Sequence, residues 1–193
     1  MSEFLETKAA LEQDLLLEAI SNDTLDVLIE AEAKYLKDAR MNLSAFNRSK
    51  EINKKELALL GLAIANTNNN PLVQAAFTKR AKAEGATAIE IADALSASSL
   101  MGANNILYRF RHFMSSESYD RMPAGIRMQV MMNPNVGKEF FELLSLAISA
   151  VNGCEMCVRA HESSLVKMGT SEARIFESIK IAAVVTSICK LVY

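Results

Sequence analysis

Two cysteines and a histidine stand close together late in the chain, in the run NGCEMCVRAH at residues 152–161. Cys154 and Cys157 are separated by two residues, and His161 follows Cys157 by four positions. On an α-helix, positions three or four apart lie on one face, so the three side chains would form one stripe. Two thiols can cycle through a disulfide, and an imidazole carries protons near neutral pH. The run predicts a redox dithiol with its own proton carrier.

The residues around this run indicate how the thiols would be positioned. Asn152 is a good capping residue, so we expect it to begin the helix that carries both cysteines. Thiols in the first turns of a helix face unpaired N–H groups and the positive dipole end, which favour the thiolate. Glu142 lies twelve residues before Cys154, on a preceding predicted helix. It would reach the thiols only if a turn at Asn152-Gly153 folds that helix back.

Other interpretations of the same residues remain open at this point. Cysteines three apart on a helix can be small buried hydrophobic residues. A metal site is also possible, because Cys154, Cys157 and His161 offer three ligands and Glu142 or water a fourth. The chain has no second C-x-x-C or paired histidines to complete a closed metal site. Cys189 lies in an apolar run, 181–192, and is expected to be a buried core thiol.

Composition restricts the class of protein. The chain has 193 residues, enough for one substantial core or two small ones. No stretch of about 18 apolar residues occurs, so we expect no membrane span. The N-terminus lacks the basic start and apolar run of an export signal, and we expect a cytoplasmic protein. The net charge of -2 gives no general attraction to nucleic acid or anionic membranes. Three cysteines do not make a disulfide framework.

The sequence predicts an all-α fold, because helix-favouring residues are plentiful and only 7 Gly and 3 Pro interrupt them. The N-terminal part, about 4–42, is expected to form two helices, over 4–20 and 25–42. Pro71 suits the first turn of a helix that ends at Gly85, and Thr87 with Glu90 has capping-box spacing. That box would open a long helix that residues 102–105 could disturb, followed by a connector from 115 to 123. The predicted helices of the C-terminal part are 138–151, a thiol helix that stops near Gly169, and a last helix capped by Ser171.

An internal repeat underlies this pattern. Residues 56–66 resemble residues 142–152, and each half reads as helix, short break, helix, glycine and long helix. The halves extend over about 54–115 and 138–193, within one domain of residues 1–193. This alignment places Asn68 and Pro71 opposite Cys154 and Cys157, so the first half lacks the thiols and is expected to serve packing.

The spacing of Glu142, Cys154, Cys157 and His161 resembles the active-site signature of the alkyl hydroperoxidase D (AhpD) family, in the carboxymuconolactone decarboxylase-like superfamily. The similarity covers nearly the whole chain after about residue 30. It includes six further segments, at 42–43, 101–109, 127–128, 133–134, 141–143 and 150–154.

This resemblance implies an all-helical fold with a duplicated helical unit, assembled as a homotrimer. It implies a thiol-dependent peroxidase with no bound cofactor, acting on a hydroperoxide. Its electrons would come from dihydrolipoamide, the lipoyl group of a lipoylated acyltransferase, and it would reduce a partner peroxiredoxin (AhpC-like). By position, Cys157 would be the attacking thiol and Cys154 the thiol that closes the disulfide. Glu142 and His161 would relay protons to Cys154.

One departure and two rival functions accompany the resemblance. The family often has a histidine immediately before the second cysteine, where this chain has Met156, which cannot move a proton. That leaves room for a non-catalytic redox sensor or adaptor whose disulfide changes a partner surface. Superfamily kinship also suggests a lactone decarboxylase, although that chemistry needs no dithiol.

Overall fold

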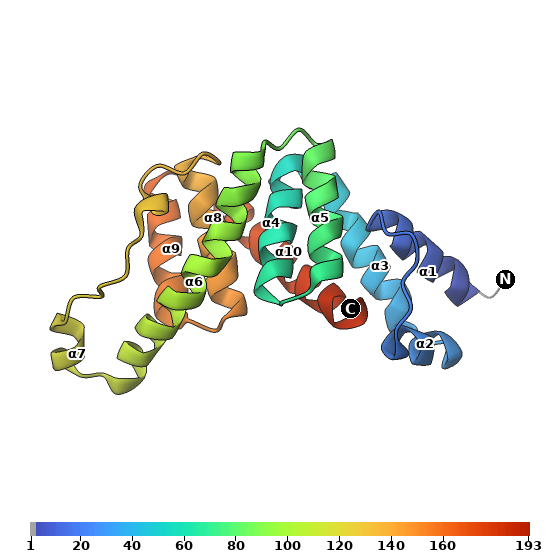
Figure 1. The fold of residues 1–193 in the computed structure, drawn as a ribbon, viewed down its shortest axis with the longest axis horizontal. Helices are drawn as coiled ribbons and strands as arrows, with labels where there is room; N and C mark the ends of the chain where they lie inside the picture. Colours follow the sequence, from blue (N-terminus) through green and yellow to red (C-terminus); the bar gives the residue numbers. More distant parts are fainter. Residues whose placement is uncertain (1–2) are drawn as a thin grey trace.

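A computed structural model describes residues 3–193, and these residues form α-helices and short 3-10 turns without a strand (Figure 1). The predicted all-α class is therefore confirmed. The helices are α1 (Glu3–Asp14), α2 (Asp23–Glu30), α3 (Tyr35–Ala45), α4 (Lys54–Thr67), α5 (Pro71–Ala83), α6 (Ala88–Met114), α7 (Glu117–Arg121), α8 (Lys138–Val151), α9 (Glu155–Lys167) and α10 (Glu172–Leu191). The 3-10 turns are η1 (Phe46–Arg48) and η2 (Gln129–Met131).

Helices α4 and α8 form the centre of the molecule. Residues 57–65 of α4 and 140–149 of α8 are buried without interruption. A helix that is apolar on every side must be covered on every side. Helices α5 and α6 pack on α4, α9 and α6 pack on α8, and α10 crosses both central helices. The site residues on α8 and α9 therefore rest on the most buried part of the fold.

The two segments α4–α6 and α8–α10 share one register. Both ends of α8 and of α9 lie 84 positions after the corresponding ends of α4 and α5, and α10 begins 84 positions after α6. This regular spacing supports the predicted repeat. It corrects the alignment of the two halves by two residues, because Asn70 and Val73, rather than Asn68 and Pro71, occupy the positions of Cys154 and Cys157.

The N-terminal part contains three helices, where the sequence suggested two. The predicted helix over 25–42 is divided at Glu32, which adopts a left-handed conformation with φ of 50°. The N–H of Ala33 bonds to the carbonyl of Leu28 and that of Glu32 to Ile29, a helix-ending arrangement usually built on glycine. Leu16, with φ of 55°, ends α1 in the same way. The last residue of α1 is Asp14, six residues before the predicted end at residue 20.

Most other predicted boundaries agree with the structure. Pro71 begins α5, Gly85 is left-handed with φ of 80°, and Ser171 caps α10. Thr87 forms the predicted capping box, and α8 has the predicted bounds. Helix α6 is continuous through residues 102–105, where a disturbance was expected, and the connector after it contains the short helix α7.

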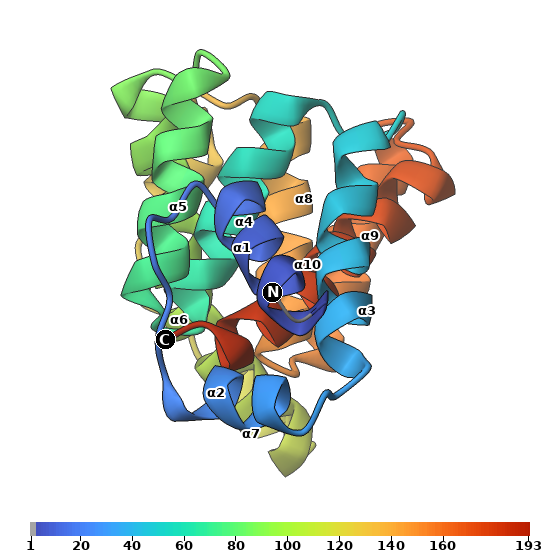
Figure 2. The same ribbon diagram turned by 90° about the vertical axis from the view of Figure 1, so that its right-hand side faces the viewer.

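The C-terminus is fixed between the N-terminal helices and the centre. Figure 2 looks onto α1–α3, with α4 and α10 behind them. The Asn22 side chain donates to the Leu191 carbonyl at 2.9 Å, and Thr24 shares a hydrogen bond with the Tyr193 hydroxyl. Asn70, at the start of α5, donates to the Cys189 carbonyl at 3.0 Å. These bonds attach the end of α10 to the N-terminal helices on one side and to the start of α5 on the other.

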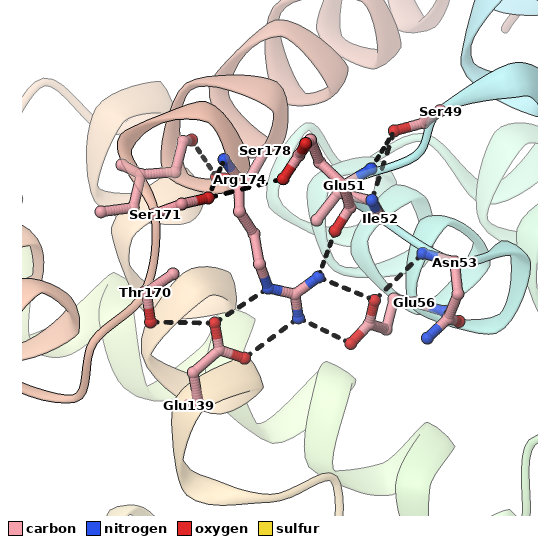
Figure 3. A network of polar contacts seen from close by, with 11 residues as sticks. Ser49, Glu51, Ile52, Asn53, Glu56, Glu139, Thr170, Ser171, Arg174 and Ser178 are labelled. Atoms are coloured by element: carbon pink, nitrogen blue, oxygen red, sulfur yellow. Dashed lines mark hydrogen bonds and ion pairs between the residues drawn. The ribbon is translucent and has the colours of Figure 1, made fainter.

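A single arginine joins the beginnings of α4, α8 and α10 (Figure 3). The Arg174 guanidinium makes two hydrogen bonds to Glu139, at 2.9 and 3.0 Å, and two to Glu56, at 2.7 and 3.0 Å. It also donates to the Glu51 carbonyl. Hydrogen bonds to Glu139, then to Glu56, raise the pKa of Arg174 above its ordinary value. The cluster connects the two repeat halves at one end of the central helices.

Replacing Arg174 with Met should lower the free energy of unfolding by about 2–3 kcal/mol, because Glu56 and Glu139 would lose their shared cation while half-buried. Urea denaturation measures this. As a matched control, Arg121→Met breaks an exposed pair with Glu117, and should cost less than about 1 kcal/mol. Equal small losses for both variants would remove the Arg174 cluster as a structural junction.

Candidate active site

The two cysteines lie at the start of α9 and form a disulfide in the structure, with their Cα atoms 5.3 Å apart. Cys154 is itself the N-cap of α9, and Cys157 lies in the first turn. The expectation that Asn152 caps this helix is therefore wrong. Asn152 instead ends α8, and within residues 3–193 no side-chain cap is formed at the start of α9.

The tight reversal between α8 and α9 is what presents the cysteines. Gly153 has φ of 69°, a conformation that costs a side-chain-bearing residue free energy. The N–H groups of Gly153 and Cys154 bond back to the carbonyls of Ala150 and Ser149, at 3.1 and 3.0 Å. Helix α8 is thus closed by backbone bonds, and α9 starts at once and packs alongside it.

This reversal brings Glu142 to His161. Glu142 Oε2 lies 2.7 Å from His161 Nδ1, and each side chain is only 12% exposed. Because a carboxylate can only accept hydrogen bonds, Nδ1 is the donor to it and Nε2 is the ring nitrogen left for another partner. The sequence alone could not establish this contact. The structure thus joins α8 and α9 through this pair, at a distance along both helices from the turn at Asn152-Gly153.

Helix α6 supports the junction from outside. Asn105 donates to Ser149 Oγ and accepts from the Asn152 side chain, both at 2.9 Å. Arg109 donates to the Asn152 carbonyl at 2.6 Å. Asn105 is 1% exposed, so these bonds are formed away from water. The positions immediately before Cys154 are therefore fixed by a third element as well as by the turn.

A cavity of about 320 Å³ opens beside the thiols. Its lining comes from α6, α9 and the segment before α8, and consists of Met101, Asn104, Asn105, Tyr108, Met128, Met131, Met156, Cys157, Ala160 and His161. Cys157 reaches this cavity, whereas Cys154 does not line it and is 1% exposed. The cavity thus offers one sulfur of the pair, and the imidazole, to a small molecule.

Several residues that line the cavity could not be assigned to the site from their residue types and spacing. Asn104 and Tyr108 entered only through the family resemblance, because nothing in their spacing points to the thiols. Met128, Met131 and Met132 have the spacing of one helical face, but they lie in and beside the short turn η2. Met128 and Met131 line the cavity, while Met132 is 78% exposed.

The remaining thiol is separate from this site. Cys189 is 6% exposed on α10, as expected, and burial raises its pKa to about 12 against a smaller opposing effect of Lys190. Within residues 3–193, no group of three or more His, Cys, Asp and Glu side chains is arranged to hold a metal ion. In the same residues, no helix has the length and apolar character needed to cross a membrane.

Comparison with known proteins identifies the family of this chain. Residues 118–193 match the carboxymuconolactone decarboxylase family. The matched range contains both Cys154 and Cys157. A protein of Rhodopseudomonas palustris (strain BisB18), named alkyl hydroperoxide reductase AhpD, is 41% identical over 86% of this chain and 91% of its own. A protein with the same name from Anaeromyxobacter sp. (strain K) is 40% identical over 83% of this chain and 86% of its own. Another, from Coxiella burnetii (strain Dugway 5J108-111), is 37% identical over 81% of this chain and 90% of its own. The chain belongs to the AhpD family.

The different surroundings of the three thiols predict different reactivity. After reduction, the native protein should react with an aromatic disulfide reagent at about pH 8 through Cys157, which lines the cavity. Cys154 should then displace the bound reagent and close the disulfide, so that two thiolates are released. Cys189 should react after denaturation, because its thiol stays protonated and buried. Absorbance of the released thiolate counts the thiols. Three thiols reacting at one fast rate in the native protein would contradict the structure.

Proposed function

We propose that this protein is a thiol-dependent alkyl hydroperoxide reductase that works through a Cys154–Cys157 dithiol/disulfide cycle. The observation that carries the proposal is the joint position of Cys157 and His161 on one cavity, with Glu142 bonded to the imidazole. The names of the AhpD relatives support a peroxide-reducing activity at the level of the family.

In the first step, the Cys157 thiolate attacks the terminal oxygen of a hydroperoxide. An S–O bond forms and the O–O bond breaks, so Cys157 becomes a sulfenic acid and the peroxide leaves as an alkoxide that takes a proton from water. The sulfur loses two electrons and the peroxide gains them. Cys157 is the attacking thiol because it reaches the cavity and Cys154 does not.

In the second step, Cys154 closes the disulfide. His161 Nε2 accepts the Cys154 thiol proton, directly or through water, and Glu142 stabilises the imidazolium through Nδ1. The Cys154 sulfur then attacks the Cys157 sulfenic acid, an S–S bond forms, and hydroxide leaves and is protonated to water. The free N–H groups at the start of α9 favour negative charge on a sulfur at either position.

Thiol–disulfide exchange would complete the cycle. Dihydrolipoamide, carried by a lipoylated acyltransferase, attacks the disulfide and leaves as the oxidised cyclic disulfide once both cysteines are thiols again. The same dithiol can pass its electrons to an AhpC-like peroxiredoxin. We propose a cytoplasmic homotrimer that binds no cofactor, and mass measurement in solution would test for three times the 21.2 kDa chain.

Cys154→Ser and Cys157→Ser variants should each lose turnover of cumene hydroperoxide with dihydrolipoamide, because either change prevents the disulfide. Cys189→Ala is the matched control and should keep the activity of the native chain. Peroxide consumption, with and without an added peroxiredoxin, measures both proposed roles. Full activity in either serine variant would refute the cycle. Background turnover in the native chain, with disulfide formation intact, would instead favour a redox sensor.

Glu142→Gln should slow turnover by about 100-fold, because a neutral amide does not stabilise the imidazolium of His161. The variant retains the size of the side chain, so thermal unfolding should change little. Turnover measured from pH 5 to 9 gives the comparison. A pH profile and rate identical to those of the native chain would remove Glu142 from the proton relay.

A further inference from the structure

Asn104 is a buried polar residue with an unused acceptor at the cavity. It lies on α6, is 5% exposed, and lines the same cavity as Cys157. Its Oδ1 is buried, and among residues 3–193 no donor bonds to it. A buried acceptor without a partner is unfavourable for folding, so its presence needs another explanation. A ligand that supplies the missing donor provides one.

The other half of the Asn104 amide is only weakly held. Its Nδ2 donates to the Met128 sulfur at 3.1 Å, and a thioether is a weak acceptor. Met128 is partly exposed and has a flexible unbranched side chain. The amide can therefore exchange this contact for a stronger one when Met128 moves. The adjacent Asn105 differs, because Ser149 and Asn152 already engage both ends of its amide.

The rest of the lining indicates what such a ligand looks like. Four methionines, Met101, Met128, Met131 and Met156, give the cavity an apolar and adaptable wall. A cavity of about 320 Å³ is much larger than hydrogen peroxide, which has no apolar surface to bury there. An organic hydroperoxide has both parts that this cavity could bind, an apolar substituent and one O–H donor.

We propose that Asn104 is the specificity-determining acceptor of a cavity for apolar organic hydroperoxides, an inference that rests on the function proposed above. The substituent packs among the methionines. Movement of Met128 frees the amide to turn, and the O–H group then donates to Asn104 Oδ1. This bond orients the terminal oxygen, which is the atom that Cys157 attacks. The hydrogen stays on that oxygen as it is transferred, so the bond persists into the sulfenic acid.

Binding tests this separately from catalysis. The probes are 2-phenylpropan-2-ol, an alcohol with the apolar group of cumene hydroperoxide, and tert-butylbenzene, in which a methyl replaces the hydroxyl. NMR titration of the disulfide form should show that Asn104→Leu lowers the preference for the alcohol roughly 3- to 10-fold, the effect of one lost hydrogen bond. Asn42→Leu, the same change at an exposed position of α3 outside this cavity, should leave the preference as it is. An unchanged preference in Asn104→Leu overturns the proposal.

Stability and the two half-reactions complete the test. Asn104→Leu should keep or raise the melting temperature, because it removes an unpaired buried acceptor; a decrease of more than roughly 4 °C would indicate a structural role and overturn the proposal. Oxidation of the reduced variant by cumene hydroperoxide should show a raised KM, with disulfide reduction by dihydrolipoamide unaffected. An unchanged KM for the hydroperoxide with slower reduction by dihydrolipoamide would mean that Asn104 binds dihydrolipoamide, and this result also overturns the proposal. If the native chain prefers the alcohol but no hydroperoxide oxidises it, the proposed function fails while the acceptor stands.

Discussion

The reversal at Asn152-Gly153 is the constraint on which the rest of the site depends. Because α8 ends there and α9 begins immediately, Cys154 becomes the N-cap of α9 and Cys157 follows in its first turn. The same reversal places α9 against α8, and only in that arrangement can Glu142 bond to His161. Helix α6 adds Asn105 and Arg109 as outside supports of the turn. One backbone feature thus packs the helix that carries the sulfurs and the imidazole against the helix that carries the carboxylate.

Comparison of the two repeat halves shows how the same scaffold carries different chemistry. In the first half, the Phe77 ring packs against Gly61 so closely that an added Cβ would lie 2.3 Å from it. At a register of 84, Phe77 corresponds to His161 and Gly61 to Ser145, and both Gly61 and Ser145 are buried. The position filled by an apolar ring in one half holds the imidazole in the other. The first half uses this position for packing, and the second half uses it for the imidazole that we propose as a proton carrier.

Much of the fold could be predicted from local signals. Pro71, Gly85, the Thr87 capping box and Ser171 each act through their own backbone, so their positions mark helix ends directly. Leu16 and Glu32 end helices without any such signal, since both residues normally favour continuation and only the surrounding structure holds them left-handed. For this reason the sequence predicted two N-terminal helices where the structure has three.

Spacing along the chain was enough to relate Cys154 to Cys157 and Cys157 to His161. The predicted single stripe is not observed, because Cys154 precedes α9 as its N-cap and does not line the cavity that the other two share. Contacts between helices were less accessible. The link from Glu142 to His161 depends on the turn geometry, and the role of Asn152 was misassigned because a capping residue can end one helix as easily as begin the next. Asn104 reaches the cavity from α6, and no sequence spacing relates it to the thiols.

The central claim is that the two sulfurs at the start of α9 exchange electrons with a hydroperoxide. The most direct measurement is mass spectrometry of the fully reduced protein after one equivalent of cumene hydroperoxide, sampled as the peroxide is consumed. The account predicts a chain lighter by two hydrogens, with a peptide joined through Cys154 and Cys157 that appears as fast as peroxide disappears. Peroxide consumption with both thiols still free, or with oxidation at Cys189 instead, would contradict it.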